Sequence, residues 1–390
     1  MEKSCILFES PDKSVVLVDI PRSIEEAQVL PGKAIDRRLV SSSPVEKPWG
    51  TPEPRNDDGC TAHSSTSPSA AIAELMTLET VRAALDKVRS SGYGGPWCLP
   101  RVVAKERAGC DAREEGKEDS QKVTSLESKE AGDVGDTLSY QGGKQTSSET
   151  NAGKNLLPPP SSAPFIPEQS HYLHGSIASQ RSAFLQTAPL FDLIVLDPPW
   201  PSRSAKRKRK NRDGGGGSYA PAYGMREARD LLAQIPIATR LKPDGGLVAI
   251  WITNKAAVAD LVLNEVFPQQ WGLEPFGEWT WVKITSSAGG EPVVDLEARW
   301  RKPWERLLIA RRKGSTAKLP SGYNGINKSK VILAVPDVHS RKPNLRALFK
   351  DILPDGYVGL EVFARNLTAG WWSWGDEVLR FQQRDHWIQS

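Results

Sequence analysis

The stretch Phe191-Asp-Leu-Ile-Val-Leu-Asp-Pro-Pro-Trp200 decides the fold. Its apolar run from Leu193 to Leu196, bounded by turn residues, is typical of a strand buried on both faces of a parallel sheet. The two prolines that follow have no N–H for a strand ladder, so the chain must leave the sheet there. Asp197 and Trp200 are thereby placed at the carboxyl end of the strand, the edge where open α/β sheets bind ligands.

The residues that end this strand suit transfer of a methyl group to an exocyclic amine. They are Asp197, Pro198, Pro199 and Trp200. Adenine N6 is a poor nucleophile because its lone pair is delocalised into the ring. The Asp197 carboxylate and the Pro198 carbonyl oxygen can accept its two N–H bonds and let the nitrogen pyramidalise, while Trp200 can stack on an extruded base. The structural alternative is a buried strand that simply ends in a proline turn.

Composition sets the outer bounds. The 390 residues carry a net charge of +4, which permits nucleic-acid binding without requiring it, and their number suggests about two or three domains. The four cysteines form no C-x-x-C pair and the five histidines are dispersed, which predicts reduced thiols in an intracellular protein and no metal site. No apolar run reaches the ~18 residues of a membrane span, and the N-terminus lacks a secretory pattern, so no membrane partner is expected.

Four regions are predicted along the chain. Residues 1–35 form an N-terminal β-hairpin, and residues 36–110 form a linker that carries one helix. Residues 111–155 are too polar to bury enough surface to offset the entropy of ordering, which predicts a disordered linker. Residues 156–390 form the main folded domain, because nearly all of the tryptophans lie there.

The predicted linker helix is amphipathic and suits a packing or partner surface better than a site. Its apolar positions recur every three or four residues: Ile72, Leu75, Leu78, Val81, Leu85 and Val88.

Strands alternate with helices in the main domain, which predicts an α/β fold with a mostly parallel, doubly wound sheet. An antiparallel arrangement is the alternative for the strands within residues 278–310. Strands are expected at 191–196, 247–253, 278–283, 306–310, 331–335 and 357–363, and helices at 176–187, 225–240, from 256 onward and at 344–352.

A basic run follows the proline turn, ahead of the glycines 214–217. Such a run beside a candidate site suits contacts to phosphate groups, and its alternatives are a nuclear import signal or a solvated loop. The run consists of Lys206, Arg207, Lys208, Arg209 and Lys210.

Asp-Pro-Pro-Trp after an apolar strand resembles the eukaryotic adenine-N6 methyltransferases. Further motifs resemble their methyltransferase-like-four branch, and together they cover about residues 155–385 in the expected order. These motifs are Ser204-Ala-Lys-Arg, Trp251-Ile-Thr-Asn254, Trp281-Val-Lys-Ile-Thr285, Lys302-Pro-Trp-Glu305, His339-Ser-Arg-Lys-Pro343, Leu360-Glu-Val-Phe-Ala-Arg-Asn366 and Gly370-Trp-Trp-Ser-Trp-Gly375.

The resemblance implies a Rossmann-like, S-adenosyl-L-methionine-dependent methyltransferase fold with permuted strand order, in which the catalytic strand precedes the cofactor strand. It implies that the Asp-Pro-Pro-Trp residues hold the target amine and base. The implied cofactor contacts are Asp197, Lys342, Glu361, Phe363, Arg365, Asn366 and Asp376. The implied substrate contacts are Tyr219, Trp251, Trp281, Glu305 and the basic run.

Several of these residues have structural alternatives. Arg365 and Asn366 could cap a strand, and Lys342 could lie on the surface. The two substrate-side tryptophans could be core residues, and Glu305 could pair with an arginine.

The chain departs from the family pattern at two motif positions. Trp304 stands where the branch has tyrosine, and Asp376 stands where the family has asparagine. An aspartate there can still accept hydrogen bonds from ribose hydroxyls.

The resulting expectation is adenine-N6 methylation of nucleic acid in the nucleus, by direct transfer between positioned groups. RNA is the favoured substrate, a small nuclear RNA adenosine among the options, with DNA adenine as the competitor. A non-catalytic RNA-binding subunit is disfavoured because the tetrad is kept, and a small-molecule methyltransferase is disfavoured by the basic run. The oligomeric state stays open, and a monomer is compatible with the sequence.

Overall fold

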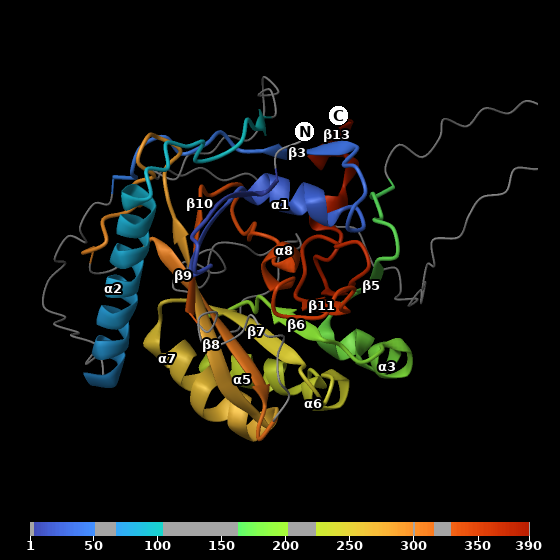
Figure 1. Ribbon diagram of the computed structural model, residues 1–390. Coiled ribbons are helices and arrows are strands. Elements are labelled where there is room, and N and C mark those ends of the chain that lie inside the picture. The colour runs from blue at the N-terminus through green and yellow to red at the C-terminus, as the bar shows by residue number, and fades with distance from the viewer. Residues whose placement is uncertain are drawn as a thin grey trace, which may run out of the picture.

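A computed structural model describes residues 4–50, 68–103, 163–201, 224–298, 301–315 and 329–389. Its centre is a ten-stranded sheet with helices on both faces (Figure 1). The sheet is mostly parallel; within it, β1–β2, β8–β9 and β7–β9 are the antiparallel pairs. The predicted α/β fold with a mostly parallel sheet is confirmed, and so is the antiparallel arrangement within residues 278–310.

The order of the strands in this sheet differs from their order in the sequence, because strands from late in the chain lie between earlier strands. In spatial order they are β1 (Ile6–Glu9), β2 (Val15–Val18), β10 (Ser329–Ala334), β8 (Leu273–Lys283), β9 (Trp304–Arg312), β7 (Leu247–Ile252), β6 (Leu193–Leu196), β11 (Gly359–Val362), β12 (Trp372–Gly375) and β5 (His171–His174). A small second sheet joins β13 (Trp387–Gln389), β3 (Arg37–Ser41) and β4 (Val102–Val103).

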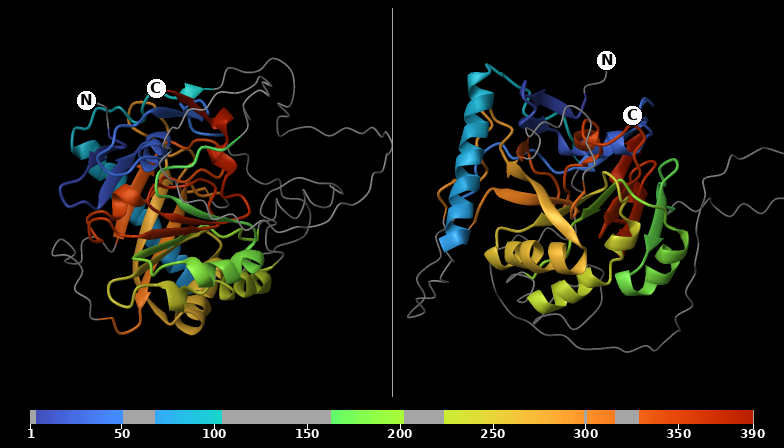
Figure 2. Two further views of the ribbon diagram at one scale, coloured as in Figure 1. Left: turned by 90° about the vertical axis from the view of Figure 1, so that its right-hand side faces the viewer. Right: turned by 60° about the horizontal axis from the view of Figure 1, so that its bottom comes forward.

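Strand β6 is buried along its whole length, as its apolar run requires. Ile194 and Leu196 pack toward one face of the sheet, and Leu193 and Val195 pack toward the other. The first face is covered by α3 (Ile177–Thr187), α5 (Met225–Ala233), α6 (Ile237–Arg240) and α7 (Ala256–Leu261) (Figure 2). The second face is covered by α1 (Ile20–Ala27) and α8 (Arg346–Phe349).

Proline changes two of the predicted helices. The helix expected over 225–240 is divided into α5 and α6, with Pro236 at the N-cap of the second. Helix α7 continues as a π-helix, η1 (Val262–Gln270), which contains Pro268. A proline has no N–H for the i→i−4 ladder, so a regular α-helix cannot run unbroken through either position. Two short 3₁₀ helices, η3 (Arg380–Gln382) and η4 (Arg384–His386), precede the last strand.

The N-terminal hairpin is part of the main sheet and is not a separate unit. Strand β2 is fully buried and pairs in parallel with β10. Strand β3, inside the region predicted as a linker, pairs with β13 at the other end of the chain. The domain boundary expected near residue 156 therefore does not divide the described fold, because its core uses residues from both sides.

Helix α2 (Pro68–Ser90) is present where the apolar periodicity predicts a helix. Leu78, Val81, Leu85 and Val88 are buried in a core with β2 and β10, whereas Ile72 and Leu75 are exposed. The predicted disordered segment 111–155 lies outside the described residues. No helix within the described ranges is both long and apolar enough to cross a bilayer.

Candidate active site

The site lies where the direction of strand connections changes. Strands β6 and β11 are parallel neighbours, and Leu196 is in register with Val362. From β6 the chain proceeds toward β7 on one side, and from β11 it proceeds to β12 on the other. Such a switch point opens a crevice at the carboxyl ends of the strands. Asp197 follows β6 and Phe363 follows β11, so both stand at this crevice.

The Asp197 carboxylate is held by two cations. Its Oδ1 lies 3.2 Å from Lys342 Nζ, and its Oδ2 accepts a hydrogen bond of 3.0 Å from Arg365 Nη1. Lys342 Nζ also lies 2.9 Å from Glu305 Oε2. Arg365 Nε donates to Glu377 Oε2 at 3.0 Å. The strand ends thus carry alternating charges with the aspartate at their centre.

Two residues of this charge network were not predicted from the sequence. Lys283, on β8, donates to Glu305 Oε1 at 2.7 Å. Glu377 stands one residue after Asp376, the position expected to contact the cofactor. Both residues occur in or beside the motifs quoted above, but spacing alone does not show which strand ends come together.

A small cavity opens beside the Asp197 carboxylate. Residues expected to bind the cofactor line it: Asp197, Lys342, Glu361, Phe363, Arg365 and Asn366, together with Trp251. Its volume is about 30 Å³, the space of a single water molecule. Because the cavity opens to solvent, this enclosed volume does not limit the size of the ligand that can bind there.

The acceptors proposed for the target amine are both at this edge. The Pro198 carbonyl oxygen accepts a hydrogen bond of 2.8 Å from the Trp200 N–H, which uses one of its two lone pairs. A carboxylate offers about four acceptor positions, and the two cations use two of those on Asp197. Pro199 completes the turn. Each acceptor therefore keeps capacity for a further donor.

Trp200 and the two other site tryptophans are largely core residues. The Trp200 indole N–H donates to the Trp251 carbonyl oxygen at 2.7 Å, which ties the end of β6 to the end of β7. Trp251 and Trp281 are buried, with ring centroids 6.1 Å apart in a T-shaped contact. Lys342 Nζ lies over both rings, at 5.6 and 5.9 Å from their centroids. Base stacking by Trp200 stays a prediction.

The charged groups of the site change one another's pKa values. Burial alone would raise the pKa of Glu305, but Lys342 and Lys283 lower it to about 2. Burial alone would lower the pKa of Lys342, but Asp197 and Glu305 raise it to about 12. Burial, with Asp197 nearby, raises the pKa of Glu361 to about 7. Glu361 is thus the carboxyl of this cavity whose charge changes near neutral pH.

The turn after β11 is conformationally special. Phe363 has a φ of 61°, in the left-handed region that side chains other than glycine rarely adopt. Asn366 lines the cavity, and its amide makes a long contact of 3.5 Å with the Leu367 carbonyl oxygen. Asp376 does not line the cavity; its side chain is exposed, and its backbone oxygen contacts His174 Nε2 at 2.9 Å.

The remaining predicted contacts are not located. Tyr219 and the basic run Lys206 to Lys210 lie outside the described residues. Within the described ranges, no cluster of three or more His, Cys, Asp or Glu side chains could hold a metal ion.

The cavity residues fit the chemistry of S-adenosyl-L-methionine. Its sulfonium and ammonium groups are cationic and suit Asp197 and Glu361, and its carboxylate suits Lys342 and Arg365. The Asn366 amide can both donate to and accept from a ribose. Paired carboxylates and cations that face one cavity are also typical of functional sites.

Comparisons with known proteins agree with this chemistry. A model of the MT-A70 family matches residues 191–377. The chain is 43% identical to the N6-methyladenosine RNA methyltransferase MTA1 of Cryphonectria parasitica, over 100% of this chain and 96% of that protein. It is 42% identical to the protein of the same name in Pyricularia oryzae, over 98% and 96% of the two chains. Human N(6)-adenine-specific methyltransferase METTL4 is 38% identical over 57% of this chain and 44% of its own length.

Proposed function

This chain belongs to the MT-A70 family and is an S-adenosyl-L-methionine-dependent adenine-N6 methyltransferase, and we propose that its substrate is adenosine in RNA. Two relatives that align with nearly the whole chain are named for RNA methylation. The observation that carries methyl transfer to an adenine amine is the position of Asp197 beside a cavity at the switch point of the sheet, with the Pro198 carbonyl oxygen in the turn that follows it.

These two acceptors activate the amine by orienting it. When the Asp197 carboxylate and the Pro198 carbonyl oxygen accept the two N6–H bonds, the nitrogen lone pair leaves conjugation with the ring. When bound, S-adenosyl-L-methionine supplies an electrophilic methyl group. No strong base is needed beforehand, because the methylated ammonium loses its proton readily. The contribution of the protein is therefore alignment and electrostatic preorganisation.

Lys342 and Arg365 give the carboxylate its orientation. Both lie within hydrogen-bonding distance of Asp197, one at each oxygen. The two cations therefore hold the carboxylate by both of its oxygens. An ionised carboxylate only accepts hydrogen bonds, which is the property that the amine requires.

The choice between RNA and DNA is tested with matched oligonucleotides. Purified protein is incubated with S-adenosyl-L-methionine and single strands of one sequence, as RNA or as DNA, and the nucleosides are quantified by mass spectrometry. We expect N6-methyladenosine from RNA at a rate at least tenfold above that of the DNA product. A higher rate on DNA would reverse the assignment, and product from neither strand would favour the non-catalytic RNA-binding subunit.

We also propose that the basic run contacts RNA phosphates and directs the protein to the nucleus. A variant with glutamine at all five positions from Lys206 to Lys210 addresses both roles. Removing phosphate contacts should weaken RNA binding and flatten its dependence on salt, since each contact releases counterions. Fluorescent fusions of the two forms compare their location. If the salt dependence of RNA binding is unchanged, the basic run does not contact phosphates. If nuclear accumulation is unchanged, the run is not an import signal.

A further inference from the structure

The loop that carries Lys342 is anchored from behind by a buried charge cluster. Residues 336–344, here the 336–344 loop, connect β10 to α8. Ser340 in this loop has a φ of 73°, a conformation that persists only where the surroundings enforce it. Lys342 and Ser340 line the cavity, whereas the side chains of Asp337 and Arg341 are 0% and 1% exposed.

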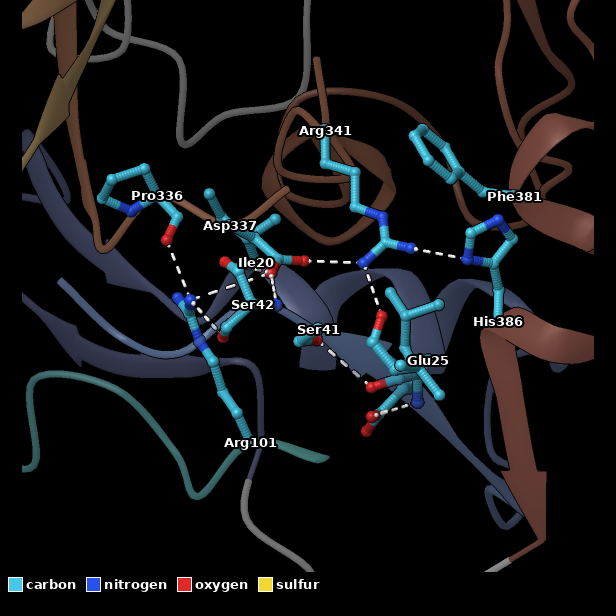
Figure 3. Close-up of polar contacts among 12 residues, drawn as sticks. Ile20, Glu25, Ser41, Ser42, Arg101, Pro336, Asp337, Arg341, Phe381 and His386 are labelled. Atoms are coloured by element: carbon cyan, nitrogen blue, oxygen red, sulfur yellow. Dashed lines mark hydrogen bonds and ion pairs between the residues drawn. The ribbon is translucent and has the colours of Figure 1, made fainter. Parts of the chain in front are cut away.

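The cluster consists of two arginines around one carboxylate. In Figure 3, Arg101 and Arg341 reach Asp337 from opposite sides. Arg341 Nη1 lies 2.9 Å from Asp337 Oδ2, and Arg101 Nη1 lies 3.7 Å from Asp337 Oδ1. The same Oδ1 accepts the backbone N–H of Ser42 at 2.8 Å. All three charged side chains are at most 1% exposed, so their arrangement is tightly determined.

The arginines bind backbone carbonyls on both sides of the cluster. Arg101 Nη2 donates to the Val335 carbonyl oxygen and its Nη1 to that of Pro336, each at 2.9 Å. Arg341 Nη1 donates to the Val40 carbonyl oxygen at 2.7 Å, which ties the loop to β3. The guanidinium of Arg341 also stacks on Phe381, 4.4 Å from the ring centroid. Segments distant in sequence thus fix the start of the 336–344 loop.

The far end of the loop is fixed independently. The Asn344 N–H donates to Ser23 Oγ at 3.0 Å, and the Asn344 side-chain amide donates to Thr368 Oγ1 at 2.9 Å. With both ends held, the loop backbone has little freedom, and Lys342 extends from a fixed Cα. The Lys342 side chain can then move between its partners without losing its place at the cavity.

From these contacts we infer that Asp337, Arg341 and Arg101 are positioning residues for Lys342, and that they make the N-terminal region part of the cofactor site. Functional groups that bind a ligand need support of this kind, because a displacement of about 1 Å at the ligand already weakens the interaction. This inference rests on cofactor binding at Lys342 and not on RNA as substrate, so a DNA-specific enzyme would leave it standing.

A double-mutant cycle tests the inference through binding of S-adenosyl-L-methionine, measured by calorimetry. Arg341→Met should weaken binding about tenfold in the otherwise native chain, but by less than twofold when Lys342→Met is already present. Non-additivity of this kind shows that Arg341 acts through Lys342. Equal factors in both backgrounds would mean a general loss of structure and would overturn the inference, as would an unchanged affinity.

Two further variants complete the design. Arg101→Lys keeps the charge but loses the two-nitrogen fork that bonds the Val335 and Pro336 carbonyl oxygens. This variant is measured in the same double-mutant cycle, and its result tests the inference if Arg341→Met does not fold. Arg312→Met is the matched control, because Arg312 also binds backbone carbonyls, those of Ala238 and Leu241, away from the cavity. Its affinity should equal that of the native chain, and a tenfold loss there would contradict a specific role for the cluster. Circular dichroism checks the folding of each variant.

Discussion

Glu361 is the cavity carboxyl with a charge that depends on pH near neutrality. Burial and the nearby Asp197 raise its pKa to about 7, so it is mostly neutral below that pH and ionised above it. A cationic cofactor favours the ionised form. We expect affinity for S-adenosyl-L-methionine to rise between pH 6 and pH 8, and Glu361→Gln to lose that part of the rise. Calorimetry on both proteins measures it, and identical pH dependence would remove Glu361 from the cofactor site.

In the ligand-free protein, Glu361 should make the folded state less stable as the pH rises, whereas it makes cofactor binding tighter. A carboxyl with a folded-state pKa above its unfolded value of about 4.5 binds its proton more tightly when folded. Its contribution is therefore full below pH 4.5 and is lost as the pH rises through 7. Urea unfolding of the native chain, compared with Glu361→Gln, should show the native chain losing relative stability from pH 5 to pH 8. A constant difference would contradict the raised pKa.

Single residues were predictable only where a motif names them. Asp197, Lys342 and Arg365 were identified as site residues, and the structure brings all three together. Glu377 and Lys283 were not, because an ion pair across strands leaves no trace in sequence spacing. The same holds for Asp337 and Arg101, which are 236 positions apart but share a buried contact.

Trp200 links two central strands of the sheet. Its indole hydrogen bond to the Trp251 carbonyl oxygen joins β6 to β7. We expect Trp200→Phe to lower the free energy of unfolding by about 1 kcal/mol more than a tryptophan-to-phenylalanine change without a hydrogen bond. Trp271→Phe is the control, since among the described residues the buried Trp271 Nε1 has no hydrogen-bond partner. Equal losses in urea unfolding would show that the hydrogen bond contributes nothing.

The elements found from sequence are those with a clear hydrophobic period. Strands β6 and β7 are uniformly apolar and buried, so their patterns identify them. Helix α1 was missed because its buried face includes Arg22 and Glu25, which pair with each other at 3.3 Å. Its N-cap, Asp19, accepts from the Arg22 N–H at 2.9 Å and was the available signal. Strand β5 was not assigned from the sequence, because His171 and His174 give it no apolar period.

The whole molecule is built from both ends of the chain. Strand β2 covers one side of β10, and α1 packs over the same face of the sheet as the cavity. Sequence reasoning separated residues 1–35 from residues 156–390 because a long polar stretch lies between them. Polarity shows where a chain need not fold, but it does not show whether the segments on either side pack together.

The fragment 156–390 should therefore not fold alone. Without β2 and α1, the edge of β10 and much of the second hydrophobic face would be exposed to water. We expect this fragment to aggregate or lack cooperative unfolding, as judged by size-exclusion chromatography and thermal circular dichroism. Deleting only residues 111–155 is the control and should preserve cooperative unfolding and cofactor binding. A monomeric, cooperatively folded 156–390 fragment would show that the N-terminal region is dispensable for the fold.

The central claim is that the Asp197 carboxylate orients the amine that receives the methyl group. Asn has nearly the shape of Asp but offers one acceptor oxygen and an N–H₂ donor, which is the wrong partner for an amine. The measurement is the single-turnover rate of methyl transfer to adenosine at saturating S-adenosyl-L-methionine, for the native chain and for Asp197→Asn. The account predicts a loss of at least about 100-fold, the scale of one preorganised electrostatic contact. A rate within threefold of the native chain would contradict it.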